Sequence, residues 1–135
     1  MSAANKEVVR RFNIEVIQNG NEDEFHTLMA LDFVNHAASP GMPTGPQSMW
    51  NTFQSVRPAL SDIRVTIHDQ IAERDMVTTR KTISGIHTGT LMGVPATGKD
   101  VAILVIDIVR VVDGKYVEHW GLNTLTSALA ALTTA

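Results

Sequence analysis

The chain has 135 residues, a formal net charge of −3, 44% apolar and 19% charged residues, and no cysteine. A length of about 100 to 150 residues is typical of one domain, so we expect a single domain over residues 1–135, and the apolar content excludes an intrinsically disordered chain. The absence of cysteine excludes disulfides and thiolate metal sites, and the acidic balance with scattered basic residues gives no reason to expect a nucleic-acid partner.

The N-terminal part of the chain carries two helical patterns. Apolar residues recur at helical spacing from Val8 to Ile17, and Asn19-Gly20 suits a helix end, which predicts a first helix over residues 4–18. Acidic residues at 22–24 precede apolar residues at the same spacing, which predicts a short second helix. Residues 31–36 are typical of a short extended segment.

A loop and a third helix follow. Residues 39–46 are rich in proline and glycine, and Pro46 suits the first turn of a helix. Met49, Trp50 and Phe53 then recur at helical spacing and predict its apolar side.

The second half of the chain has the β-branched, alternating pattern of strands. Four strands are predicted, over residues 63–71, 76–83, 101–112 and 116–120. Arg74-Asp75 and Asp113-Gly114 are suited to tight hairpin turns. Helices followed by hairpin-linked strands predict an α+β fold with an antiparallel sheet, and the tail from Thr126 is either a short helix or a frayed end.

Residues 93–99 match the spacing of a phosphate-binding loop, but the match fails in its chemistry. Asp100 stands where that loop needs Ser or Thr, and a strand follows where phosphate binding needs a helix. We interpret this segment as a hairpin connection. The five histidines have no metal-ligand spacing, so no metal site is expected.

Asp107 is the first candidate catalytic residue, because alternation puts it on the same face as Val105 and Val109 in an apolar strand. With a two-residue turn at 113–114, Asp107 would stand opposite Trp120. Burial is expected to raise the pKa of the Asp107 carboxyl, so that it donates a hydrogen bond to an oxyanion. The alternative is a carboxylate satisfied by a neighbouring donor or salt bridge, without a catalytic role.

Two histidines are candidate proton carriers. His36 precedes the proline- and glycine-rich loop and is a candidate general base, with a surface histidine as the alternative. His87 lies in a Gly-x-His-x-Gly pattern that serves either chemistry or strand geometry. His119 has the opposite parity to Trp120, which places it on the convex side of the sheet.

Several motifs follow one another in a fixed order along the chain. They are Phe33-Val34-Asn35-His36, Gly85-Ile86-His87-Thr88-Gly89, residues 93–99, residues 106–115 and Glu118-His119-Trp120. In order and spacing these motifs resemble the SnoaL-like polyketide cyclase family of the nuclear transport factor 2-like superfamily. The resemblance covers nearly the whole chain.

The resemblance implies a cone-shaped fold, in which a curved antiparallel sheet packs against three N-terminal helices around one apolar pocket. It also implies ring closure by an intramolecular aldol reaction with no metal or cofactor, and related steroid isomerases place an acid at the position of Asp107. The chain departs from the pattern after Glu118-His119-Trp120, where many members carry an acid and this chain has Asn123 and Thr124.

We therefore expect a cofactor-independent cyclase or isomerase acting on an apolar, enolisable carbonyl compound, with Asp107 stabilising the oxyanion and His36 or His87 moving the proton. The alternatives are a non-catalytic small-molecule binding protein of the same fold and a hydroxylase-associated member that acts with a reductase. A planar or polycyclic ligand is expected to contact Asn35, Met49, Trp50, Phe53 and Trp120.

The sequence also predicts location and assembly. The longest apolar run, Val101 to Ile106, is shorter than the roughly 18 residues that span a bilayer, and the first residues lack the apolar stretch of a signal peptide. A cytoplasmic location is therefore expected. Ile106 and Ile108 would lie together on the convex face of the sheet, which predicts a homodimer through that face.

Overall fold

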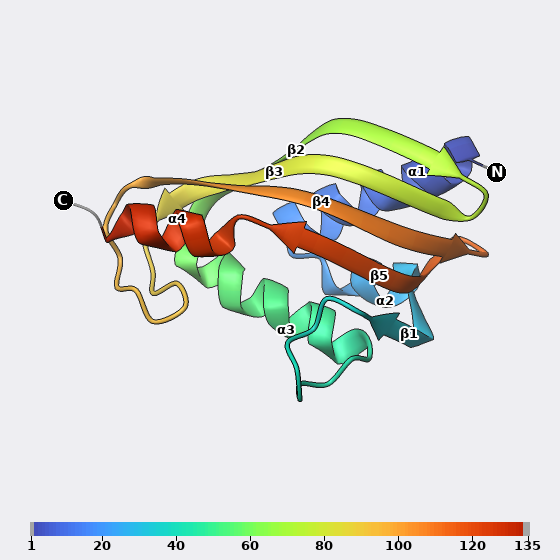
Figure 1. The fold of residues 1–135 in the computed structure, drawn as a ribbon, viewed down its shortest axis with the longest axis horizontal. Coiled ribbons are helices and arrows are strands. Elements are labelled where there is room, and N and C mark those ends of the chain that lie inside the picture. Colours follow the sequence, from blue (N-terminus) through green and yellow to red (C-terminus); the bar gives the residue numbers. More distant parts are fainter. Residues whose placement is uncertain (1, 134–135) are drawn as a thin grey trace.

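The computed structural model describes residues 2–133 and has helices packed on one side of a curved five-stranded sheet (Figure 1). The strand order is β1-β5-β4-β3-β2. The helical elements are α1 (Ser2–Arg11), η1 (Phe12–Gln18), α2 (Glu22–Leu28), α3 (Pro46–Val56), η2 (Arg57–Ala59) and α4 (Leu125–Leu132). The strands are β1 (Met29–Asn35), β2 (Leu60–Glu73), β3 (Met76–His87), β4 (Asp100–Val112) and β5 (Lys115–Asn123). The predicted α+β fold is confirmed.

The three predicted N-terminal helices are present. The first is α-helical over α1 and continues as η1, a π-helical segment whose wider turns change which side chains face the sheet. Asn21 caps α2, because its side-chain oxygen accepts a hydrogen bond from the backbone N–H of Glu24 at 3.2 Å. Pro46 occupies the first turn of α3, where its missing N–H leaves no bond unmade.

The sheet contains both predicted hairpins. Glu73 pairs with Met76 and Val112 with Lys115, which leaves Arg74-Asp75 and Asp113-Gly114 as the two-residue turns. Strand β1 differs from the predicted antiparallel arrangement, because it joins the edge of the sheet parallel to β5. The tail is helical, and α4 packs its apolar side against β4 and neighbouring residues.

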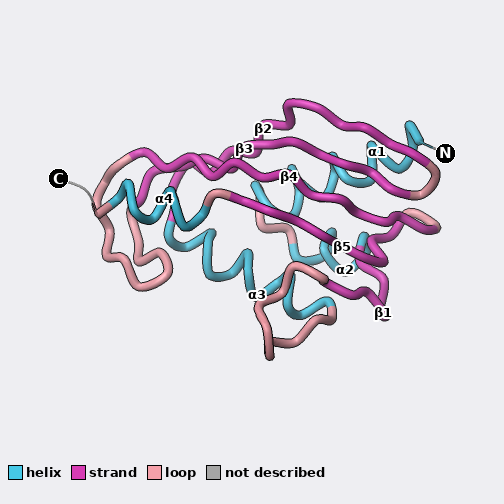
Figure 2. Tube along the Cα trace, viewed as in Figure 1, coloured by secondary structure: helices cyan, strands magenta, loops and turns pink. Residues whose placement is uncertain are grey.

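The core lies between the concave face of the sheet and the helices. Phe12 of η1 stacks on Tyr116 of β5 with ring centroids 4.2 Å apart, and its other ring neighbours are Phe25 and Phe53. A second apolar cluster lies under α4, at the end of the sheet where the long loop of residues 88–99 joins β3 to β4 (Figure 2). This connection is a hairpin loop, as predicted. Within residues 2–133 no helix is both long and apolar enough to cross a membrane.

Candidate functional site

A β-bulge in β5 determines which side chains share the concave face. Val111 pairs with Tyr116 while Arg110 pairs with Glu118, so Val117 is an extra residue in β5. One extra residue reverses the parity of every residue that follows it. Asp107 therefore faces Gly121, and the predicted pairing of Asp107 with Trp120 is wrong.

The same bulge places His119 beside Asp107 on the concave face, so the prediction that His119 lies on the convex side is also wrong. Gly121 leaves room for this contact. A Cβ atom at position 121 would lie 3.1 Å from the His119 ring and 3.3 Å from Cβ of Asp107. A larger residue at this position would push the pair apart.

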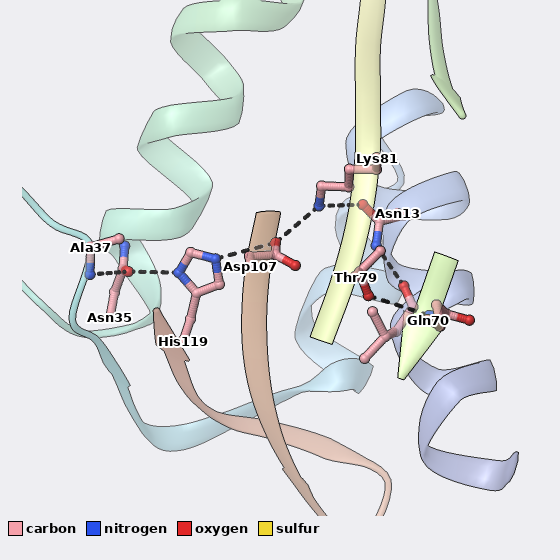
Figure 3. Close-up of polar contacts among 9 residues, drawn as sticks. Asn13, Asn35, Ala37, Gln70, Thr79, Lys81, Asp107 and His119 are labelled. Carbon is pink, nitrogen blue, oxygen red and sulfur yellow. Dashed lines mark hydrogen bonds and ion pairs between the residues drawn. The ribbon is translucent and has the colours of Figure 1, made fainter. Parts of the chain in front are cut away.

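Asp107 is buried, with 6% of its surface exposed, and its two carboxylate oxygens have different surroundings. Oδ2 accepts a hydrogen bond from Lys81 Nζ at 3.1 Å and lies 3.4 Å from Nε2 of His119 (Figure 3). Oδ1 is buried and has no hydrogen-bond partner among residues 2–133. A buried oxygen without a donor is costly, which marks this atom as a candidate for contact with a ligand.

Two asparagines hold the neighbours of Asp107. Lys81 Nζ also donates to Oδ1 of Asn13 on η1 at 2.6 Å, and Asn13 in turn donates to the carbonyl of Val9 at 2.9 Å. Nδ1 of His119 lies 2.9 Å from Oδ1 of Asn35. The site is thus a continuous line of polar side chains across an apolar face.

The direction of the His119 hydrogen bond follows from a third group. Oδ1 of Asn35 accepts a hydrogen bond from the backbone N–H of Ala37 at 3.0 Å, which identifies this atom as the amide oxygen. Nδ1 of His119 therefore donates to Asn35. Nε2 then donates to the carboxylate of Asp107 in the imidazolium form, in which both ring nitrogens carry a proton.

The electrostatics of the site differ from the prediction. Burial alone would raise the pKa of Asp107, but the charge of Lys81 and the hydrogen bond and charge of His119 outweigh burial and hold the pKa below its ordinary value. The expected raised pKa is therefore wrong, and Asp107 is an ionised carboxylate at neutral pH. Burial, with the charge of Asp107, raises the pKa of Tyr116 well above its ordinary value, so this phenol is neutral.

A narrow cavity of about 90 Å³ lies on the concave face between α3 and the sheet. On the sheet side it reaches Ile83, Val105 and Asn123. Each of these lies two residues along its strand from Lys81, Asp107 or Gly121, which corresponds to about 7 Å. The sheet side of the cavity therefore ends about 7 Å along the strands from the residues of the polar site.

The two other candidate catalytic residues lie elsewhere. His87 is fully buried, and its ring bonds to Oγ1 of Thr97 at 2.9 Å and to the carbonyl of Val94 at 3.2 Å, so it ties down the loop of residues 88–99. His36 lies 2.9 Å from the Glu118 carboxylate and stacks on Trp120 at 4.8 Å. The structure brings neither histidine into contact with Asp107 in the part of the chain that it describes.

The predicted ligand-contacting residues are distributed over three environments. Asn35 joins the polar site through His119, and Phe53 lines the cavity. Met49 is buried in the core, and Trp50 packs on Phe25 with ring centroids 5.0 Å apart. Trp120 lies on the opposite, convex face in an apolar groove with Leu122 and Ile106. The pocket expected from Met49, Trp50, Phe53 and Trp120 together is not formed.

Sequence reasoning missed Lys81, Asn13 and Gly121. A signal for Lys81 was present, because it has the same alternation parity as Val77 and Thr79 in β3 and so falls on the buried face. Asn13 gave no comparable signal, since the π-helical turn changes the phase of the helix at that point. No cluster of three or more His, Asp or Glu side chains suited to a metal occurs within the described residues.

The chain is similar to proteins of a known family and to solved structures. The family model for SnoaL-like polyketide cyclases matches residues 7–132. The chain belongs to the SnoaL-like polyketide cyclase family. Aklanonic acid methyl ester cyclase DnrD from Streptomyces peucetius is 28% identical over 116 residues, which is 84% of this chain and 79% of DnrD.

Two solved structures show the same fold. IdmH from Streptomyces antibioticus, provisionally assigned as a polyketide cyclase, is 27% identical, with a TM-score of 0.84 over 96% of this chain and 99% of IdmH. AclR from Streptomyces galilaeus, provisionally assigned as a hydroxylase, is 24% identical, with a TM-score of 0.85 over 98% of this chain and 97% of AclR. The fold of this SnoaL-like protein is therefore shared by proteins with different assigned activities.

Proposed function

We propose that this SnoaL-like protein is a cofactor-independent enzyme that moves a proton on an apolar, enolisable carbonyl compound. The observation that carries the proposal is Oδ1 of Asp107, a buried and unpartnered carboxylate oxygen on the apolar concave face. Because the carboxylate is ionised, its role is that of proton acceptor. This reverses the donor role expected from the sequence.

The neighbours of Asp107 suit that role. Lys81 and His119 both bind Oδ2, so they orient the carboxylate and leave Oδ1 available for a C–H proton beside a carbonyl. When that C–H bond breaks, its electron pair moves to the carbonyl oxygen as an enolate. Lys81 has three N–H donors and uses two, for Asp107 and Asn13, so the third is available to the enolate oxygen.

The fate of the enolate distinguishes the two reactions open to this site. Return of the proton from Asp107 to another carbon gives an isomerase. Attack of the enolate carbon on a second carbonyl of the same molecule instead closes a ring, and the proton held by Asp107 then passes to the alkoxide oxygen formed from that second carbonyl. The likeness to DnrD, a named cyclase, supports ring closure. The likeness to AclR concerns the fold, and we do not extend hydroxylase activity to this chain.

Two observations favour a second candidate, a binding protein without turnover. Asp107 forms a buried ion pair with Lys81 at 3.1 Å, which is the arrangement expected of a carboxylate without a catalytic role. The cavity of about 90 Å³ is also smaller than the roughly 300 Å³ or more of a site for a drug-sized ligand, so a polycyclic ligand fits only if α3 or α4 moves. A ligand held beside the Lys81–Asp107 ion pair would then be bound and released unchanged.

Exchange of the α-protons of cyclohexanone for deuterium, followed by NMR, tests the proposal. We expect the wild type to accelerate exchange and Asp107→Asn to lose about a hundredfold or more of that acceleration. Asp113→Asn is the matched control, because Asp113 lies in an exposed turn at φ 52° that asparagine also tolerates. The double variant Asp107→Asn with Lys81→Gln removes both charges if the single variant is unstable.

Two results would contradict this proposal. Equal exchange by wild type and Asp107→Asn would remove Asp107 as the proton acceptor. Binding of cyclohexanone with no acceleration in the wild type would support the binding protein instead.

A further inference from the structure

Asn13 holds the ammonium group of Lys81 from the helix side of the core. It is the second residue of η1 and is fully buried. Its Oδ1 atom accepts a hydrogen bond from Lys81 Nζ at 2.6 Å, which is shorter than the 3.1 Å between Lys81 Nζ and Oδ2 of Asp107. The ammonium group therefore lies between an amide of the helical layer and a carboxylate of the sheet (Figure 3).

The orientation of the Asn13 amide is fixed from both sides. Its Nδ2 atom donates to the carbonyl of Val9 at 2.9 Å, and its oxygen faces Lys81, which carries only donors. Asn13 lies near the point where the helix changes from α to π geometry, and further along η1 the backbone N–H of Asn19 donates to the carbonyl of Ile14, five residues earlier, at 3.0 Å. Such π-helical segments are rare and frequent at functional sites.

The alternative partner for the same N–H group is the free oxygen of Asp107. The three N–H donors of an ammonium group rotate freely, so it can bind both oxygens of one carboxylate. In β1 to β5, Oδ1 of Asp107 is the one buried side-chain oxygen without a hydrogen-bond partner among residues 2–133. It belongs to the carboxylate that Lys81 already contacts through Oδ2. An N–H group released by Asn13 would therefore have Oδ1 as an unfilled acceptor beside it.

We propose that Asn13 is a positioning residue, which binds one N–H of Lys81 and so keeps the ammonium group on Oδ2 of Asp107 and Oδ1 uncovered for the substrate proton. This inference rests on the proposed function, in which Oδ1 is the proton acceptor. Asn13 acts through Lys81 and makes no contact of its own with the substrate.

The neutral charge of Asn13 is part of this role. The amide accepts a hydrogen bond from Lys81 without competing for its charge, so Asp107 is the only carboxylate within salt-bridge distance of the ammonium group among residues 2–133. An acid at position 13 would share that charge. The position and the neutrality of Asn13 can therefore be tested by two different substitutions.

Asn13→Leu tests the position, because leucine keeps the branched shape of the side chain and removes its acceptor. We expect the exchange of cyclohexanone α-protons to slow by about tenfold or more, since Lys81 then covers Oδ1. The pKa of Asp107, followed by NMR of its carboxyl carbon, should not rise, because the carboxylate keeps its cation and gains a donor. Asn51→Leu is the control, since Asn51 is exposed on α3 and accepts only from Gln47.

Asn13→Asp tests the neutrality, because aspartate is nearly isosteric with asparagine and keeps an oxygen for Lys81. We expect the pKa of Asp107 to rise above its wild-type value, since two carboxylates then share one ammonium group. Asn51→Asp adds the same charge at an exposed position and should leave the pKa of Asp107 at the wild-type value.

The two readouts separate a positioning role from a structural one. Wild-type exchange in Asn13→Leu, a raised Asp107 pKa in Asn13→Leu, or an unchanged Asp107 pKa in Asn13→Asp overturns the role of Asn13. If one variant does not fold, the other decides alone. If the wild type does not accelerate exchange, the proposed function fails, and the pKa of Asp107 in the two variants still decides whether Asn13 directs Lys81.

Discussion

Asp107 combines two functions in one side chain. Its Oδ2 atom accepts from Lys81 and lies beside His119, which keeps a buried carboxylate ionised, while Oδ1 stays without a donor. The ionised state depends on Lys81 and His119, since a carboxyl group buried here without a partner would be driven to its neutral form. Asp107 can therefore accept a proton only because it is paired with Lys81.

Replacement of Lys81 by methionine tests this dependence through stability. The lowered pKa of Asp107 gives the wild type a stabilising contribution that is present at neutral pH and lost as pH falls through that pKa. Without Lys81, burial should raise the pKa of Asp107 above its unfolded value. We expect Lys81→Met to lose about 3 to 5 kcal/mol at neutral pH, because a buried charge is left uncompensated, and to regain part of this as pH falls.

Urea unfolding at a series of pH values measures that effect. Lys115→Met is the control, since Lys115 is the exposed first residue of β5 and donates to the backbone carbonyl of Thr27. Its pH profile should follow that of the wild type. A Lys81→Met profile that also follows the wild type would show that Lys81 does not set the charge state of Asp107.

At the scale of elements, periodicity predicted the helices and strands well and the site poorly. The apolar repeats of α1 to α3 and the alternation in β2 to β5 are long enough to identify each element, and both hairpin turns follow from their residue types. Which face of the sheet a side chain lies on depends on the exact register of the paired strands. A single extra residue at Val117 exchanges the positions of His119 and Trp120, and nothing in the local sequence marks that bulge.

Two further elements depend on long-range packing. Strand β1 pairs with β5, more than 80 residues away, and its parallel direction comes from the chain path and not from its own sequence. The η1 segment brings Asn13 to Lys81, from a different helix face than a regular α-helix would present. Asp107 was identified because an isolated acid in an apolar strand is a local signal, whereas its partners are brought together only by the tertiary fold.

In the molecule as a whole, the convex face of the sheet carries an exposed apolar groove. Leu104, Ile106 and Leu122 are 56%, 54% and 82% exposed, and with Ile108 and Trp120 they line a groove of about 580 Å³. An exposed apolar groove on a sheet face favours association with a second copy of the chain. We therefore expect a homodimer through this face, with the cavity of each protomer facing away from the interface.

Light scattering of Leu122→Asp tests the dimer. Leu122 pairs with Ile106 across β4 and β5, so a carboxylate there would be buried in the expected interface, and the variant should be monomeric with its fold retained. Met92→Asp is the control, because Met92 is exposed in the loop of residues 88–99, at φ 47°, away from the groove. A monomeric wild type, or a dimeric Leu122→Asp, would place the interface elsewhere or remove it.

Direct titration of the Asp107 carboxyl group tests most closely whether this residue is an ionised proton acceptor. The chemical shift of the Asp107 carboxyl carbon can be followed by NMR as pH is lowered in the intact protein. We expect a pKa below the ordinary value for aspartate, because Lys81 and His119 together outweigh burial. A pKa well above that value would contradict the role of Asp107 as proton acceptor, since Asp107 would then hold its proton and act as a donor.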